Sequence, residues 1–191
     1  MVLAAGASTR LGTPKQLLQL NGQPLLNIVL REVENADVKN IILVLGSSYE
    51  IIKDNIDEMK VHIIYNENWT EGMASSMIVG LKAALELDPA VEGVIFVVCD
   101  QPFISASLLD GLIEKHQQSG LPIVASSYAE TLGTPAYFHK SLFPELMLLS
   151  GDSGAKKILQ KYSDEVAAVE FSRGSIDIDT NEDLQYLKES L

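Results

Sequence analysis

The stretch Gly93-Val-Ile-Phe-Val-Val-Cys-Asp100 decides the predicted fold. Every position from Val94 to Cys99 is apolar, so this segment does not alternate between an apolar and a polar face. A strand of this kind is typical of the centre of a parallel sheet that helices cover on both faces. An aspartate follows directly, at the carboxyl end of the predicted strand, where open α/β sheets bind their ligands.

Apolar runs of strand length lie on both sides of this segment and alternate with segments of helical period. The alternation predicts an α/β protein with three layers, in which a mostly parallel sheet lies between two layers of helices. The predicted strands cover residues 1–5, 40–45, 61–65, 93–99 and 122–126. The predicted helices cover residues 24–34, 48–58, 74–87 and 106–119.

The pattern becomes less regular after residue 127. A short β-like segment at 136–138, a helix at 141–149 and a helical start near Gly154 are expected there. We therefore predict one domain over residues 1–191, in which residues 128–175 form an excursion that covers the site. A last helix is predicted over 181–190. The sequence Thr180-Asn-Glu-Asp183 opens it, with Thr180 at the N-cap and Asp183 three positions later.

The composition limits the class of protein. The 191 residues are 47% hydrophobic and 21% charged, which is typical of one compact soluble domain. No apolar run approaches the roughly 20 residues of a membrane-spanning helix, and the apolar start is too short for a secretory signal. We expect a cytoplasmic protein with no membrane partner. The single cysteine, Cys99, excludes an internal disulfide, and the three histidines lack zinc-binding spacing, so any metal should be hard and oxygen-bound.

The charge is negative and unevenly distributed. There are 14 Lys and Arg residues against 26 Asp and Glu residues, a net charge of −12, which argues against a nucleic-acid partner. Residues 1–31, however, contain Arg10, Lys15 and Arg31 and no acid, a net charge of +3. A basic segment in an acidic protein predicts a small anionic ligand near the N-terminus.

The segment Leu3-Ala-Ala-Gly6-Ala-Ser-Thr-Arg10-Leu-Gly12-Thr-Pro-Lys15 follows the first predicted strand directly. Its small side chains let backbone N–H groups approach an anion closely, and two cations follow on the same loop. It matches neither the P-loop pattern, which needs a lysine after the second glycine, nor the dinucleotide pattern G-x-G-x-x-G. From composition alone, a glycine turn with solvated Arg10 and Lys15 is the better interpretation.

The run L-A-A-G-x-S-x-R-[ML]-G-x-P-K changes this interpretation. It resembles the N-terminal signature of nucleotidyltransferases with a glycosyltransferase-A-like fold, and specifically of the molybdenum cofactor cytidylyltransferases. Further motifs of that family follow in the same order across nearly the whole chain: Asn68-Trp-Thr-Glu-Gly-Met-Ala-Ser-Ser76, Asp100-Gln-Pro102, Gly133-Thr-Pro135, Gly151-Asp-Ser-Gly-Ala155 and Asp177-Ile-Asp-Thr-Asn-Glu-Asp-Leu184. The resemblance implies the Rossmann-like sheet of the nucleotide-diphospho-sugar transferases.

The resemblance also implies residues that bind the nucleotide. The base and phosphates would be held by Leu3, Ala4, Ala5 and Gly6, together with Gly72 and Ser76 at the cytosine and ribose. Arg10 and Lys15 would be catalytic and would neutralise the triphosphate. Relatives with L-A-A-G use CTP and those with L-A-G-G use GTP, so Ala5 favours CTP. From the residues alone, Gly72 to Ser76 is a helix N-terminus with Ser75 or Ser76 as its cap.

The other implied residues bind metal and acceptor. Asp100 and Asp179 match the magnesium ligands of the family, and Asp152, Ser153 and Gly154 fall where relatives contact the acceptor. Each has a plainer interpretation: Asp179 as a loop aspartate, Asp152 or Ser153 as a helix cap, and Asp100 as a cap that lies too early for the helix near Ser105. Trp69 is interpreted as packing and Cys99 as a buried, inert thiol.

The implied enzyme is a CTP:molybdopterin cytidylyltransferase, a nucleotidyltransferase of molybdenum cofactor biosynthesis. It would use Mg²⁺ to transfer CMP from CTP to the terminal phosphate of molybdopterin, release pyrophosphate, and pass its product to a molybdenum hydroxylase. Three alternatives stay open: a transferase that uses GTP or a sugar or polyol phosphate acceptor, a non-catalytic carrier or insertion chaperone of the molybdenum cofactor, and, least favoured, a dinucleotide-dependent oxidoreductase.

Overall fold

A computed structural model describes residues 1–9, 11–57, 59–152, 154–178, 180, 182, 183 and 185. Within them, seven strands form one sheet in the order β5-β4-β1-β6-β8-β7-β9, and two short strands form a separate hairpin. The sheet consists of β1 (Val2–Ala4), β4 (Ile42–Leu45), β5 (His62–Tyr65), β6 (Gly93–Val98), β7 (Ile123–Tyr128), β8 (Thr131–His139) and β9 (Val166–Glu170), and the hairpin of β2 (Gln19–Leu20) and β3 (Gln23–Pro24).

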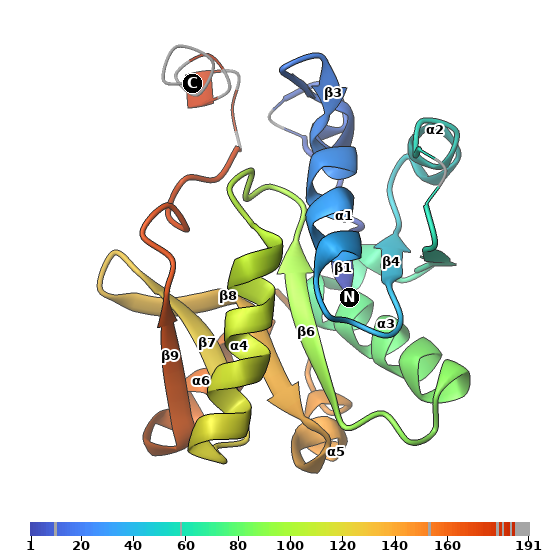
Figure 1. The fold of residues 1–191 in the computed structure, drawn as a ribbon. Helices are drawn as coiled ribbons and strands as arrows, with labels where there is room; N and C mark the ends of the chain where they lie inside the picture. Colours follow the sequence, from blue (N-terminus) through green and yellow to red (C-terminus); the bar gives the residue numbers. More distant parts are fainter. Residues whose placement is uncertain are drawn as a thin grey trace.

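Helices cover both faces of the sheet, which confirms the predicted three-layer α/β class (Figure 1). The α-helices are α1 (Leu25–Asn35), α2 (Tyr49–Lys53), α3 (Met73–Leu87), α4 (Ala106–Ser119), α5 (Phe143–Leu146) and α6 (Lys156–Lys161). Four short 3₁₀ helices connect them: η1 (Lys15–Leu17), η2 (Trp69–Glu71), η3 (Lys140–Leu142) and η4 (Ser163–Glu165). The predicted helix over 106–119 agrees with α4, whereas α2 is much shorter than the predicted 48–58.

Two apolar cores explain why the central strands are apolar at successive positions. Val2 and Ala4 of β1 pack in the core under α1 and α4, whereas Leu3 packs in the core under α3. The same alternation holds in β6, where Ile95 faces the first core and Phe96 the second. Side chains on a strand point alternately to opposite faces, so a strand buried on both faces must be apolar throughout.

The position of β1 determines where a site can form. It is parallel to β4 on one side and to β6 on the other, with Val2 opposite both Leu43 and Val97. The carboxyl ends of these three strands therefore lie at the same edge of the sheet. Residues that follow β1 and β6, including Gly6 and Asp100, lie close together although about 90 residues separate them in sequence.

Residues 128–175 are a correction to the sequence prediction. The β-like segment predicted at 136–138 is part of the nine-residue strand β8, which lies antiparallel between β6 and β7. The edge strand β9 was not predicted; it pairs in parallel with β7. Much of this segment therefore completes the sheet and does not form an excursion over it. Gly133 and Pro135 interrupt the residue pattern of β8, and the pairing with β7 shifts register between Ala125 and Ser126, which obscured the strand in the sequence.

The predicted helix-entry sequence near the C-terminus is confirmed. The backbone N–H and the Oγ1 hydroxyl of Thr180 donate to Asp183 Oδ2 at 2.7 and 2.8 Å. The Asp183 N–H donates to Thr180 Oγ1 at 3.2 Å, so the two residues form a reciprocal capping box. Most of the predicted helix over 181–190 lies outside the described residues.

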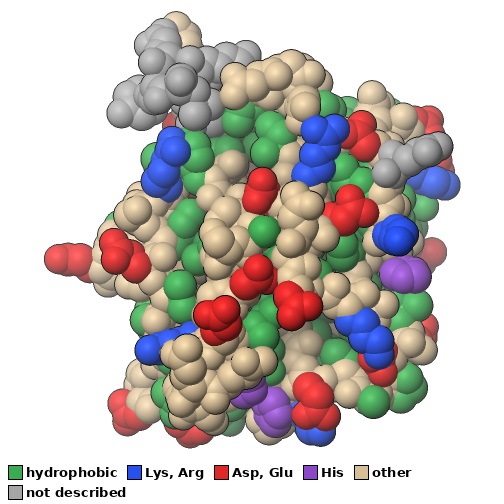
Figure 2. Space-filling view, in the orientation of Figure 1, with side chains coloured by type: hydrophobic (Ala, Val, Ile, Leu, Met, Phe, Trp, Pro, Cys, Tyr) green, Lys and Arg blue, Asp and Glu red, His purple; other side chains and the backbone are tan. Residues whose placement is uncertain are grey.

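The surface carries the negative charge that the composition predicts. In the face shown in Figure 2, acidic side chains are spread across the middle and Lys and Arg lie nearer its margin. No helix among the residues that the structure describes has both the length and the hydropathy to cross a bilayer. A cytoplasmic location stays a prediction.

Candidate active site

A cavity of about 420 Å³ opens at the carboxyl edge of the sheet. It brings together residues from the β1 loop, which we define as residues 5–14, from the end of β6, from the start of α3 and from the loop before α6. Its lining consists of Leu3, Ala4, Ala5, Gly6, Lys15, Gln16, Trp69, Thr70, Gly72, Met73, Ser76, Val98, Cys99, Asp100 and Asp152. Nine predicted site residues therefore line one cavity, although their positions in the sequence extend from 3 to 152.

Hydrogen bonds hold the β1 loop near both of its ends. The Ser47 N–H donates to the carbonyl oxygen of Ala5 at 3.0 Å, and the Lys15 N–H donates to Ser8 Oγ at 3.0 Å. Ser8 has a positive φ of 51° and Gly12 one of 69°, so the chain turns sharply on both sides of residue 10. These turns return Lys15 to the carboxyl edge of the sheet.

Lys15 and Asp100 form an ion pair in the cavity. Lys15 Nζ lies 2.5 Å from Asp100 Oδ2, and the two side chains are 16% and 21% exposed. Asp100 follows β6, and its carbonyl oxygen accepts a hydrogen bond from the Ile178 N–H at 3.0 Å. The helix-cap explanation for Asp100 does not hold, because Ser105 caps α4 by accepting from the Leu108 N–H at 3.2 Å. A partly buried carboxylate is therefore held beside a cation at the edge where ligands bind.

The start of α3 forms another wall of the cavity. Gly72 is the N-cap of this helix, with a φ of +98°, so neither Ser75 nor Ser76 caps it as the plainer interpretation had it. Ser75 Oγ donates to the carbonyl of Gly72 at 2.8 Å. Asn66, which the sequence analysis did not single out, is fully buried and donates from Nδ2 to the hydroxyl oxygens of Ser75 and Ser76 at 2.8 and 2.9 Å. This amide holds Ser76 in place at the cavity wall.

The loop before α6 closes the cavity from the other side. The Ala74 N–H donates to the carbonyl of Gly151 at 3.1 Å, which joins this loop to α3. Asp152 lines the cavity and does not cap α6, whose N-cap is Ala155. Gly154, predicted to contact the acceptor, does not line the cavity; it packs on α3, where a Cβ added to it would lie 2.7 Å from Met73 Sδ.

Two further cavity residues support the interpretations made from sequence. Cys99 is buried, and burial raises the pKa of its thiol to about 12, with the negative charge of Asp100 acting in the same direction. A thiol with so high a pKa is not a nucleophile at neutral pH. Trp69 packs closely on Gly46, because a Cβ added to Gly46 would lie only 2.5 Å from Trp69 Cβ. Trp69 also lines the cavity.

The comparisons with known proteins agree with this geometry. The family model described as "MobA-like NTP transferase domain" matches residues 1–166. The chain belongs to this family. Membership of the MobA-like NTP transferase family identifies the protein as a nucleotidyltransferase. This agrees with the resemblance of its N-terminal loop to the signature of nucleotidyltransferases.

Individual relatives of the MobA-like domain carry different names. Nicotine blue oxidoreductase of Paenarthrobacter nicotinovorans is 27% identical over 98% of this chain and 94% of its own length. A 2-C-methyl-D-erythritol 4-phosphate cytidylyltransferase of Leptospira interrogans is 36% identical over an aligned region that covers 69% of this chain and 56% of that protein. The crystal structure of Rv0371c from Mycobacterium tuberculosis matches with a TM-score of 0.85 and 29% identity, over 98% of this chain and 95% of that one.

A divalent metal is compatible with the residues of this MobA-like site. Rv0371c was also solved in complex with manganese, and that structure matches with a TM-score of 0.80 and 27% identity over 100% of this chain and 97% of that one. Of the residues described here, no three His, Cys, Asp or Glu side chains are grouped as a metal site would require. Asp100 nevertheless supplies a hard carboxylate oxygen at the carboxyl end of β6. Mg²⁺ in enzymes typically uses one or two carboxylates together with substrate phosphates, so this donor is suitable.

Three predicted site residues cannot be placed. Arg10, Ser153 and Asp179 lie outside the described residues. Their roles in phosphate, acceptor and metal binding stay predictions, although residues on either side of each one are described.

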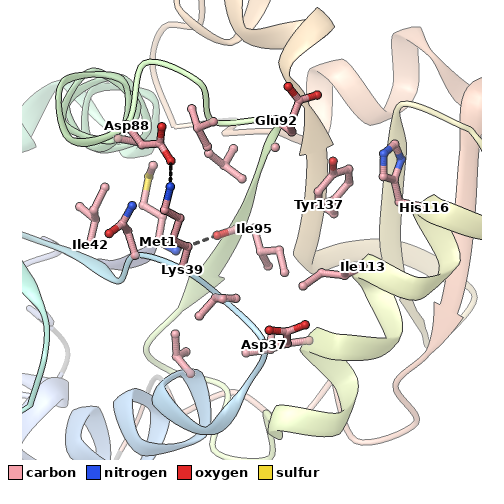
Figure 3. Close-up of a pocket in the computed structure, with 18 of the residues that line it drawn as sticks. Met1, Asp37, Lys39, Ile42, Asp88, Glu92, Ile95, Ile113, His116 and Tyr137 are labelled. Atoms are coloured by element: carbon pink, nitrogen blue, oxygen red, sulfur yellow. Dashed lines mark hydrogen bonds and ion pairs between the residues drawn. The ribbon is translucent and has the colours of Figure 1, made fainter.

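A second, larger cavity of about 560 Å³ lies at the opposite edge of the sheet, near Gly93 at the start of β6 (Figure 3). Lys39 Nζ pairs with Asp88 Oδ2 at 2.6 Å beside it, and the Met1 amino group donates to the Ile95 carbonyl at 2.9 Å. Burial lowers the pKa of that amino group to about 5. None of the predicted site residues that the structure describes lines this cavity. We place the active site in the smaller one, because the carboxyl edge of such sheets binds the ligand.

Proposed function

We propose that this protein transfers CMP from CTP to the terminal phosphate of molybdopterin in a magnesium-dependent reaction and so releases pyrophosphate. The proposal rests on one observation. A single cavity is lined by the small-residue loop after β1, by the Lys15–Asp100 pair and by Asp152. In the proposed complex the nucleotide lies at the loop after β1 and the acceptor lies at Asp152.

Each residue has a distinct task in the proposed reaction. Backbone N–H groups of Ala5 and Gly6 bind phosphate oxygens, because small side chains leave the backbone accessible. Lys15 moves from Asp100 to the phosphates and offsets their negative charge. Asp100, with Asp179 as predicted, would hold Mg²⁺, which when bound supplies further positive charge to the phosphates.

The chemical step needs no protein nucleophile. An oxygen of the acceptor phosphate forms a bond to the α-phosphorus of CTP. The bond from that phosphorus to the oxygen bridging to the β-phosphorus breaks, and pyrophosphate leaves with the electron pair. Catalysis of this kind depends on positioning and on charge stabilisation. The buried Cys99 thiol, with its raised pKa, is consistent with that requirement.

The preference for CTP rests on Ala5. This residue is buried and lines the cavity, where glycine would leave space for one more methyl group. A difference of one methyl group in a binding pocket is worth about 1–3 kcal/mol, so the preference should be clear and not absolute. The cytidylyltransferase name of the Leptospira relative also supports CTP.

A polyol phosphate acceptor is the second candidate. It is favoured by the same relative, which is named for 2-C-methyl-D-erythritol 4-phosphate and is 36% identical over 140 residues. In both candidates the attacking group is a phosphate monoester oxygen. The cavity and the positions of Lys15 and Asp100 are compatible with either acceptor, so both acceptors are compared in the same assay.

The test is a pyrophosphate-release assay with Mg²⁺, in which CTP and GTP are each combined with molybdopterin or 2-C-methyl-D-erythritol 4-phosphate. We expect release from CTP with molybdopterin, and its loss in Asp100→Ala. A preference for GTP would refute the assignment of the base. Release with the polyol phosphate alone would change the acceptor. Binding of molybdopterin without release in any combination would favour the carrier interpretation over catalysis.

The oxidoreductase name of one relative calls for a separate control. Trp69 is the only tryptophan of the chain and lines the cavity, so its fluorescence should report ligand binding directly. We expect a saturable change with CTP and none with NADH. A saturable response to NADH and none to CTP would favour the dinucleotide-dependent oxidoreductase over the nucleotidyltransferase that uses CTP. The transfer of product to a molybdenum hydroxylase would then be tested with purified partners.

A further inference from the structure

Gln16 is a fully buried amide beside the candidate active site. Its side chain is 0% exposed, and it follows Lys15 in the first turn of η1. A buried amide is costly unless it is hydrogen-bonded. Its Nε2 group donates to the carbonyl of Ala4 at 2.7 Å and to the carbonyl of Gly6 at 3.2 Å. These two carbonyls flank Ala5 at the start of the β1 loop.

The two hydrogen bonds determine how the loop presents its N–H groups. In a trans peptide the C=O and N–H bonds point in opposite directions. The Ala4 and Gly6 carbonyls point to Gln16, so the N–H groups of Ala5 and Ala7 point away from it. Gln16 therefore sets the direction of the Ala5 N–H, one of the two donors that the proposed function assigns to the phosphates.

The same side chain also links the loop to the charged pair. Lys15 immediately precedes Gln16, its N–H donates to Ser8 Oγ, and its Nζ contacts Asp100. Gln16 is thus attached to the beginning of the β1 loop through its side chain and to the end of the loop through its backbone. Movement of this amide would shift the N–H donors and Lys15 together.

The oxygen atom of the Gln16 side chain indicates that this residue holds the loop in one orientation. Gln16 Oε1 is buried and accepts no hydrogen bond from the residues that the structure describes. Turning the amide over would bring Oε1 against two carbonyl oxygens, so its orientation is determined. An unpaired buried acceptor lowers the stability of the fold. A methionine would fill the same volume, but it would leave the Ala4 and Gly6 carbonyls without this donor, so the glutamine is matched to the geometry of the loop.

We propose that Gln16 is a positioning residue for nucleotide binding, which holds the β1 loop and Lys15 in the geometry that a nucleoside triphosphate requires. The inference rests on the proposed function of this cavity. It does not depend on which base or which acceptor the enzyme uses.

The test compares Gln16→Met with a matched control, Asn27→Leu. Asn27 is also a buried amide: its Nδ2 donates to the Asn55 carbonyl at 3.2 Å, and its Oδ1 accepts no hydrogen bond from the described part of the chain. It lies in α1 and does not line the cavity. Both variants are examined for thermal stability, for CTP binding by Trp69 fluorescence, and for kcat and KM in pyrophosphate release. If Gln16→Met does not fold, Gln16→Glu provides the same comparison.

We expect Gln16→Met to raise both KM and Kd for CTP by about tenfold or more with a smaller change in kcat, as loss of ground-state binding does. Asn27→Leu should leave both constants unchanged. In Gln16→Glu, lower pH should restore affinity, because the protonated carboxyl group can donate to the Ala4 carbonyl again. Unchanged Kd in both Gln16 variants would overturn the inference while leaving the proposed function intact. Failure of the unsubstituted protein to bind any nucleoside triphosphate would refute both.

Discussion

A methyl group on Gly72 would collide with the loop that carries Asp152. In Gly72→Ala the new Cβ would lie 2.5 Å from Asp152 Oδ1 and 2.6 Å from the carbonyl carbon of Gly151. Ordinary contact begins at 3.4 Å, so the backbone of the loop at Gly151 must move by about 0.8 Å. In addition, the φ of +98° at this position is strained for alanine, at a cost of about 1–3 kcal/mol.

The matched control is Gly120→Ala at the C-cap of α4. Gly120 also has a positive φ, of 68°, but nothing lies within 4 Å of its added Cβ. It should lose only about 1 kcal/mol of unfolding free energy and keep its activity. Gly72→Ala should lose about 3 kcal/mol or more, since steric overlap adds to the backbone strain.

The assays are urea unfolding and pyrophosphate release. A displacement of about 1 Å at a catalytic site can reduce the rate about 100-fold, so kcat/KM of Gly72→Ala should fall by about that factor. Equal losses of stability in the two glycine variants, with full activity in both, would refute the contact between α3 and the loop before α6.

Three further predictions concern charged and nucleophilic groups. Lys15→Met should abolish detectable pyrophosphate release while retaining the fold, as measured by kcat and circular dichroism; substantial remaining activity would contradict its role at the phosphates. Cys99 should react with iodoacetamide at pH 8 only after denaturation, because burial raises the pKa of its thiol to about 12, and rapid native alkylation would disprove this. Hydrogen bonds from Lys161 and Tyr162 lower the pKa of Glu145 below its usual 4.5, so the stability that it adds should be present above pH 4.5 and lost as the pH falls through the folded-state pKa. The difference in melting temperature between the unsubstituted protein and Glu145→Gln should therefore vanish in acid; a difference independent of pH would exclude this contribution.

The first half of the fold was predictable because its strands carry a simple signal. β1, β4 and β6 are buried on both faces, so they appear in the sequence as continuous apolar runs. The antiparallel strand β8 contains Gly133 and Pro135, which usually indicate a turn, so only its last part was predicted. One of the two partner strands of β8, β6, is far away in sequence, and local pattern does not report that pairing.

The candidate site was predictable to a similar extent. Lys15, Asp100 and Gly72 belong to recognisable motifs, and the parallel sheet brings their positions to one edge. Gln16 and Asn66 were missed, because a single amide in the sequence carries no signal of which groups it will hydrogen-bond. The targets of both side chains, backbone carbonyls and serine hydroxyls, become apparent only once the loops are folded.

The central place of β1 has a consequence for how the protein is synthesised. A ribosome makes residues 2–4 well before residues 93–98, which form one of the two strands beside them. Strand β1 must remain without that neighbour until the residues between the two strands have been made. Contacts of such long sequence separation form slowly and leave apolar segments exposed meanwhile. Truncated products that end before β6 should therefore aggregate, and the nucleotide pocket should appear only late in translation.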